Sequence, residues 1–372
     1  MEMNEILVTY GENIEEQAYS LAETAELSAL IGGRERRIGL KPNLVLASPA
    51  EEGATTHPEI ARGLIRYLRK NGFTNIVILE GSWVGARTGD AFPLCGYTAL
   101  VSDLGSAETR VELLDLQADR AHPYDCKGMK IEICDSAMAV DFMINLPVMK
   151  GHCQTLVTCA LKNNKGVLPD REKQRFHSLG LHKPIAHLNT VAKNDFILVD
   201  GICGDLDFEE GGNPVYSGKL YAARDPVLCD AWTAAQMGYR VEEIPYIGMA
   251  AALGVGCADP AKAVIRELTP PLVPRKAPTD QRSEPSGKVR QLASYINEEK
   301  SCSACYANLI FALSRMEKAE LKKLPEKVCI GQGFKGKAGT LGVGRCTGSF
   351  DASLPGCPPA GTDIAAFLRG LM

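Results

Sequence analysis

The chain has 372 residues, of which 45% are hydrophobic and 23% charged, and its net charge at pH 7 is −4. This length exceeds what one ordinary hydrophobic core supports, so we expect two domains. The small negative charge gives no footprint for nucleic acid, and we expect no DNA or RNA partner. We expect no signal peptide and no membrane span, because the first residues lack a basic segment and no run approaches about eighteen apolar residues. A cytoplasmic location is therefore the expectation.

Residues 38–80 predict a strand–helix–strand unit. RIGLKPNLVL is a short apolar strand that runs into a polar turn, and TTHPEIARGLIRYLRKNG places apolar residues at helical spacing. Thr56 and Glu59 have the spacing of a capping box, with Pro58 in the first turn of the helix. NIVILEG follows as a continuous apolar run, which is typical of a strand buried on both faces of a parallel sheet.

Similar apolar runs return at 141–147 and 195–201. We therefore expect a layered α/β fold over residues 1–267, with a mostly parallel sheet and flanking helices. Functional side chains of such sheets gather at the carboxyl ends of the strands. The side chains that the sequence places there are Lys41, Asn43, Glu80, Lys150, His152 and Asp200.

The composition changes between residues 268 and 287. This segment is rich in proline and poor in apolar residues, and it predicts an extended linker. Residues 288–372 predict a small α/β module in which cysteine is concentrated. Structural disulfides are not expected in a reducing cytoplasm. Cysteines outside this module are expected to be small buried hydrophobic residues.

The cysteines of the module have the spacing of metal ligands: Cys302 and Cys305 form C-x2-C, and Cys329, Cys346 and Cys357 follow. Four thiolates suit zinc or an iron–sulfur cluster. A zinc ribbon usually closes with a second C-x2-C pair, whereas the later cysteines here come singly, in GRCTG and PGCPP. Glycines beside them leave room for backbone N–H groups to approach cluster sulfurs. A [4Fe–4S] cluster is the favoured cofactor, and zinc is the alternative.

The order C-x2-C, G-x-C, P-G-C-P-P resembles the proximal [4Fe–4S] site of nickel–iron hydrogenase small subunits and of the related cluster subunit of respiratory complex I. The likeness covers residues 302–359, and PGCPP is its specific part. The spacing between the second and third ligands differs from that in those subunits. The resemblance leaves Cys329 as a strand cysteine. The ligands that it implies are Cys302, Cys305, Cys346 and Cys357.

A basic stretch, LPVMKGHCQTLVTCALKNNKGVL, places Lys150 and His152 just after a strand and Lys162 and Asn163 in a glycine-bounded turn. Such side chains would line a site for an anionic ligand, although a purely structural role weighs equally. Acidic residues near strand ends or glycine-rich turns would move a proton or hold a second metal. These acids are Glu80, Asp200, Asp205, Asp225 and Asp230.

Seven motifs along residues 35–260 resemble the family called domain of unknown function 362. They are KPNLV, TTHPE, ILEGS, LPVMKGH, ALKNNKGVL, LVDGI and ARDPVLCDAWTAAQMGY. The family is associated with iron–sulfur proteins, and many members carry ferredoxin-like C-x2-C-x2-C modules. This chain has the hydrogenase-like spacing instead, so a two-cluster relay is not expected.

Two functions follow from these patterns. The first is a redox protein of anaerobic metabolism, an oxidoreductase whose single [4Fe–4S] cluster passes electrons to an anionic small molecule or partner protein at the large domain. The second is a non-redox enzyme for a small carboxylate or phosphate, with a structural or sensing cluster. In that enzyme Lys150, His152, Lys162 and Asn163 would hold the anion, and Glu80 or Asp200 would handle a proton.

Overall fold

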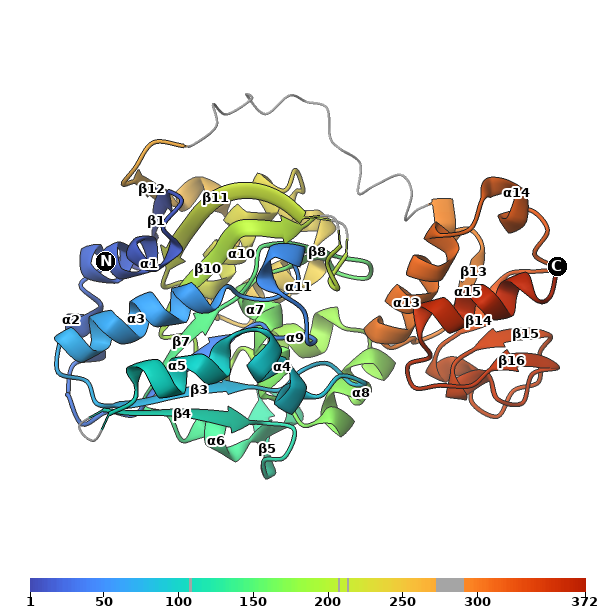
Figure 1. The fold of residues 1–372 in the computed structure, drawn as a ribbon, viewed down its shortest axis with the longest axis horizontal. Coiled ribbons are helices and arrows are strands. Elements are labelled where there is room, and N and C mark those ends of the chain that lie inside the picture. Colours follow the sequence, from blue (N-terminus) through green and yellow to red (C-terminus); the bar gives the residue numbers. More distant parts are fainter. Residues whose placement is uncertain (107–108, 207, 213, 272–290) are drawn as a thin grey trace. The chain divides into compact units, whose positions relative to one another are not determined.

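The computed structural model describes residues 1–106, 109–206, 208–212, 214–271 and 291–372 (Figure 1). Contacts divide the chain into two compact units. Unit 1 is Met1–Glu172 with His182–Gln281, and unit 2 is Lys173–Leu181 with Arg282–Met372. The expected linker, 268–287, lies outside the described residues from position 272 onward, and the domain limits given above stay predictions.

An eight-stranded sheet forms the centre of unit 1. All neighbouring strands are parallel except where β11 pairs with β1 and β10, which confirms the predicted mostly parallel α/β fold. In order across the sheet, the strands are β12 (Val264–Glu267), β1 (Glu5–Tyr10), β11 (Pro214–Ala223), β10 (Phe196–Asp205), β7 (Phe142–Leu146), β2 (Ile38–Pro42), β3 (Asn75–Glu80) and β4 (Arg110–Asp115).

Helices flank this sheet (Figure 1), and two small antiparallel ribbons lie outside it. The ribbons are β5 (Ala121–Cys126) with β6 (Met129–Cys134), and β8 (Lys150–His152) with β9 (Leu156–Thr158). Among the described residues, no helix is both long and apolar enough to cross a membrane. The helices are α1 (Ile14–Thr24), α2 (Leu27–Ile31), α3 (Pro58–Lys70), α4 (Thr88–Leu94), α5 (Tyr97–Leu104), α6 (Asp135–Met138), α7 (Ala160–Asn163), α8 (Asp170–Leu179), which crosses the unit boundary, α9 (His182–Leu188), α10 (Pro226–Gln236) and α11 (Pro245–Ala252).

Helix α3 follows the predicted pattern along its length but not at its start. Its periodic apolar residues are buried, and Pro58 opens the first turn. The predicted capping box is wrong, because the N-cap is His57 and its side chain makes no capping bond. The Thr56 hydroxyl instead donates to Leu146 O (2.7 Å) and accepts from Asn43 N (2.8 Å). Thr56 therefore joins the ends of β2 and β7 instead of capping the helix.

Unit 2 contains a four-stranded sheet whose neighbouring strands are all parallel. Its order is β13 (Ile296–Glu298), β14 (Val328–Ile330), β15 (Leu341–Val343) and β16 (Ala352–Leu354). Helices α13 (Ser303–Ser314) and α15 (Gly361–Arg369) pack together, and α14 (Lys318–Leu321) follows α13. Asn308 of α13 donates to Pro359 O (2.9 Å), which fixes the segment that enters α15.

Close packing of α1 on α3 depends on Gly63. A Cβ at this position would collide with the carbonyl oxygen of Glu15 and meet Ala18 Cβ at 3.0 Å. Gly248 in α11 is a matched glycine, because a Cβ there meets nothing within 4 Å. Replacing each of these two helical glycines by alanine therefore separates the effect of steric crowding on stability from the effect of helix propensity.

We expect Gly63→Ala to lower the free energy of unfolding of unit 1 by about 1–3 kcal/mol, because a well-packed interface must move apart. Gly248→Ala should leave it unchanged or raise it by up to about 1 kcal/mol through helix propensity. Urea unfolding followed by tryptophan fluorescence measures this, because Trp83 and Trp232 both lie in unit 1. Equal midpoints for the two variants would contradict the prediction.

Candidate functional site

The four cysteines predicted to hold a cluster lie along one edge of the unit 2 sheet. Because the strands are parallel, their carboxyl ends share that edge. Cys302 follows β13 as the N-cap of α13, and Cys305 lies in the first turn of that helix. Cys346 follows β15, and Cys357 follows β16. Residues that are far apart in the sequence therefore follow the ends of three strands, of which β15 and β16 are neighbours.

Backbone hydrogen bonds hold the turns of Cys346 and Cys357 side by side. Gly344 N donates to Leu354 O (2.8 Å), and Arg345 N donates to Gly356 O (2.7 Å). Gly344 and Gly356 have φ values of 95° and 146°, which side chains with a Cβ rarely adopt. The glycines of G-x-C and P-G-C thus give the backbone the geometry that brings these two cysteines together.

The four thiols share one electrostatic environment. Burial raises the pKa of Cys305 well above its usual range, and Cys302, Cys357 and Cys346 raise it further. Cys357 is exposed, whereas the other three are partly buried. Four thiolates so placed repel one another, and a bound metal centre would remove that repulsion.

Cys329 and Gln332 lie on β14 and just after it. Cys329 sits inside the strand instead of at its end, and its sulfur accepts from Asn297 Nδ2 (3.5 Å). Gln332 Nε2 points toward Cys302 Sγ (3.7 Å), while Gln332 Oε1 accepts from Lys335 Nζ (3.4 Å). The end of β14 therefore contributes an amide donor to the cysteine group, and not a thiol.

Lys41 and Glu80 form a buried ion pair at the carboxyl edge of the unit 1 sheet, with 2.9 Å between Nζ and Oε2. Glu80 also accepts from the backbone N–H groups of Gly81 (2.7 Å) and Leu44 (3.2 Å). A Cβ at Gly166 would collide with both charged groups. The glycine of the KNNKG turn is therefore what lets this turn cover the pair.

Lys150 is fully buried, and three acceptors match its three N–H bonds. They are Asn43 Oδ1 (3.2 Å), Ala54 O (2.5 Å) and Glu209 O (2.9 Å). Burial lowers the pKa of Lys150 to about 8. The ammonium fixes the loops of Ala54 and Glu209 in place, because each of its hydrogens has an acceptor.

Glu209 joins His152 to Lys162. Its Oε2 lies 2.6 Å from His152 Nε2, and its Oε1 lies 2.9 Å from Lys162 Nζ. The Nδ1 atom of His152 accepts from Gln154 N (3.0 Å) and Thr155 N (3.1 Å), which assigns the ring proton to Nε2. Burial lowers the pKa of His152 to about 4, so the ring is neutral at pH 7.

Asp200 pairs with His57 and not with the lysines. Its Oδ2 accepts from His57 N (2.8 Å) and lies 2.8 Å from His57 Nδ1. Burial opposes a charged ring, but the carboxylate outweighs it and raises the pKa of His57 to about 11. Asn163 donates to Asn145 Oδ1 (2.7 Å) and links neighbouring strand ends.

Sequence reasoning missed three residues of these groups. His57 stands inside the TTHPE motif, which was interpreted only as the start of a helix. Glu209 belongs to DFEEGG, an acidic pair in a glycine-rich turn after β10. Gln332 occupies the turn of IGQG after β14, which matches VGRC after β15. For Glu209 and Gln332 the available signal was a position in the turn after a strand.

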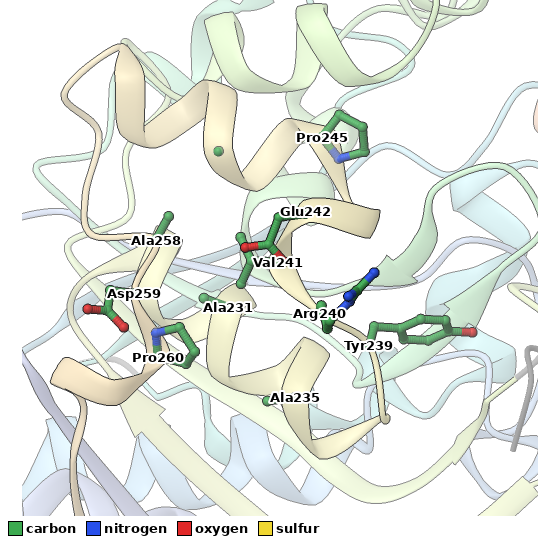
Figure 2. A pocket seen from close by; sticks show the side chains of 11 residues that line it. Ala231, Ala235, Tyr239, Arg240, Val241, Glu242, Pro245, Ala258, Asp259 and Pro260 are labelled. Carbon is green, nitrogen blue, oxygen red and sulfur yellow. The ribbon is translucent and has the colours of Figure 1, made fainter. Parts of the chain in front are cut away.

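A surface pocket of about 710 Å³ lies beside α10 and α11 (Figure 2). Ala231 and Ala235 line it from α10, and Arg240, Glu242 and Asp259 add charged groups. Its described lining includes none of the site residues predicted from the sequence.

Stability should fall as the pH is lowered from 6.5 toward 4, because the unfolded chain protonates His152 first and the folded chain does not. A shift from 6.5 to about 4 contributes at most about 3 kcal/mol, present above pH 6.5 and lost as the pH falls through the folded pKa. His152→Gln should remove this part of the pH dependence of the urea midpoint.

His122→Gln is the matched control, because the His122 side chain is 68% exposed. That variant should keep the wild-type pH dependence. An unchanged slope in His152→Gln would mean that the ring titrates normally in the folded protein.

Comparisons with known proteins agree with the motifs in unit 1. The family DUF362, domain of unknown function, matches residues 38–235. A thylakoid-associated protein from Synechocystis sp. is 25% identical over 144 residues, which are 38% of this chain and 42% of that protein. The chain thus spans less than half the length of this curated relative.

Two solved structures are also similar to this chain. Lactate racemase apoprotein from Thermoanaerobacterium thermosaccharolyticum has a TM-score of 0.40 and 14% identity, over 59% of this chain and 54% of that one. A protein from Thermotoga maritima has a TM-score of 0.37 and 13% identity, over 65% and 60% of the two chains. The sequence match over residues 38–235, more than half of this chain, shows that it belongs to the DUF362 family.

Proposed function

We propose that this chain is a cytoplasmic iron–sulfur oxidoreductase. In this proposal one [4Fe–4S] cluster is held by Cys302, Cys305, Cys346 and Cys357, and it passes electrons to an anionic small molecule or a partner protein. The observation that carries the proposal is the position of these cysteines, which follow the carboxyl ends of parallel strands β13, β15 and β16. The cluster would supply one-electron chemistry, and the chain would supply its ligands and surroundings.

The separation of the sulfurs supports a cluster over a zinc ion. In the ranges that the structure covers, no three of these four sulfurs lie within 4.8 Å of one another. A tetrahedral zinc ion with Zn–S bonds of about 2.3 Å would hold them closer than that. A cubane is larger than a single ion, and its ligand sulfurs lie farther apart.

Residues around the cysteines suit electron exchange. Gln332 Nε2 donates to Gln174 O (3.1 Å) and lies 3.7 Å from Cys302 Sγ, and N–H groups near cluster sulfurs tune the reduction potential. Lys335 and Arg345 lower the pKa of Cys346, although burial outweighs them. Their positive charges would stabilise the more negative reduced cluster and attract an anionic acceptor. The exposed Cys357 gives a partner short access to the cluster.

The non-redox alternative would use the charge network of unit 1. There Glu209 already occupies the place of an anion against Lys162 and His152, and Lys150 has a full set of acceptors. A carboxylate or phosphate would have to displace the Glu209 side chain before it could bind. Electron transfer is therefore the function that we place first.

Protein purified without oxygen should contain about four irons and four sulfides per chain and give an electron paramagnetic resonance signal after reduction. Cys346→Ala should lose this signal together with most of the iron, because it removes a ligand. Cys329→Ala should keep both, since Cys329 lies inside β14. Iron and sulfide analysis with electron paramagnetic resonance measures all three proteins.

Stoichiometric zinc without sulfide in the wild-type protein would end the proposal. Loss of the signal in Cys329→Ala with its retention in Cys346→Ala would give a different ligand set. The Gln332→Leu variant tests the surroundings separately: it should keep the cluster but shift its reduction potential.

A further inference from the structure

A second group of metal-ligating side chains lies in unit 1. Cys159 is the N-cap of α7, and Cys229 and Asp230 are neighbours on α10. One ligand atom from each lies within 4.8 Å of the other two. All three residues have no exposed surface. Two elements separated by about seventy positions in the sequence thus bring two thiols and a carboxylate together.

The Asp230 carboxylate forms no ion pair with any lysine, arginine or histidine that the structure describes. Both of its oxygens accept weakly from Leu161 N, at 3.4 and 3.3 Å, and the carboxyl group also has hydrogen bonds with Ala160 N, the Cys159 thiol and the Tyr246 hydroxyl. A buried carboxylate is normally paired with a cation, bound to a metal, or neutral. Burial raises the pKa of Asp230 well above its usual range, so the carboxyl group is neutral unless a cation between it and the two sulfurs stabilises its charged form.

Thr233 provides a fourth donor beside the Cys159 sulfur. Its Oγ1 lies 3.5 Å from Cys159 Sγ, and it donates its only hydrogen to Cys229 O (2.7 Å). Tyr221 OH therefore acts as the donor in its 2.7 Å contact with Thr233 Oγ1. One lone pair of Oγ1 remains on the threonine, beside the Cys159 sulfur.

We propose that Cys159, Cys229 and Asp230 bind one Zn²⁺ ion, with Thr233 Oγ1 as the fourth ligand. Zn–S bonds of about 2.3 Å and Zn–O bonds of about 2.0–2.2 Å keep the two sulfurs and the carboxylate oxygen within the observed 4.8 Å, and the 3.5 Å contact with Cys159 Sγ places Thr233 Oγ1 beside them. Each thiol would release its proton on binding, and the metal would undergo no redox change. Because the group is closed to solvent, the ion enters as the chain folds and serves a structural role.

The ion would fasten α7 to α10. Helix α7 carries Lys162 and Asn163, so the same ion would hold the KNNKG turn over the Lys41–Glu80 pair. This role is independent of the cluster in unit 2, and it needs no substrate.

The test measures zinc in full-length protein purified from zinc-supplemented medium. Wild type should hold one zinc per chain, and so should Cys357→Ala, which changes only unit 2. Cys229→Ala should hold none. Cys134→Ala is the matched control, because that buried thiol contacts Leu116 O (3.4 Å) far along the chain from α7 and α10, and it should keep its zinc.

A second measurement covers the case in which Cys229→Ala does not fold. Asp230→Asn keeps the size of the side chain and should lower zinc affinity, so a strong chelator should reduce its thermal midpoint less than that of wild type. Wild-type protein without zinc, even after refolding with one equivalent, would overturn the proposal. So would zinc that Cys229→Ala retains, or zinc that Cys357→Ala loses.

Discussion

Parallel strands that end at a common edge are the constraint on which both units depend. In a parallel sheet every carboxyl end points the same way, so the residues that follow the strands meet whatever their distance in sequence. Unit 2 uses this edge to gather thiols from β13, β15 and β16. Unit 1 uses the corresponding edge to gather lysines, histidines and carboxylates. The chemistry of each edge is set by the first polar residues after each strand.

Burial then decides how the charges of unit 1 behave. An isolated charge is costly in a low-dielectric interior, so each one must find a partner or lose its charge. Lys41 forms an ion pair with Glu80, Lys162 with Glu209, and His57 with Asp200. His152 faces the same carboxylate as Lys162 but remains neutral because burial lowers its pKa, and the two backbone N–H groups on its Nδ1 place the ring proton on Nε2.

The sequence predicted what depends on local pattern. The spacing of apolar residues predicted the buried face of α3, and continuous runs of apolar residues predicted parallel strands of unit 1. The strands β13, β15 and β16 were missed because three residues each are too few for periodicity to be visible. The capping role given to Thr56 was wrong because a tertiary bond to Leu146 competes for the hydroxyl.

Partners that come from distant segments were beyond the reach of such patterns. The isolated cysteines Cys159 and Cys229 were expected to be buried, and they are, but nothing in either segment indicates that the two thiols meet. Glu209 was visible as an acid in a glycine-rich turn, yet its contacts with His152 and Lys162 depend on how three loops fold. The local sequence indicates which side chains can form hydrogen bonds or bind a metal, whereas the topology decides which of them become partners.

The two cysteine groups differ in a way that explains why one chain would hold two kinds of metal centre. In unit 2 Cys302 and Cys305 share the start of α13, whereas Cys346 and Cys357 stand on separate turns after the neighbouring strands β15 and β16, which are about 4.8 Å apart. In unit 1 two ligands are adjacent on one helix and the third caps another, so the donors converge on a single point. Thiols on separate turns leave room for an inorganic cluster, whereas donors that converge on one point leave room for a single ion. In these two proposals the spacing of the backbone elements, together with the identity of the donors, decides which centre each group would hold.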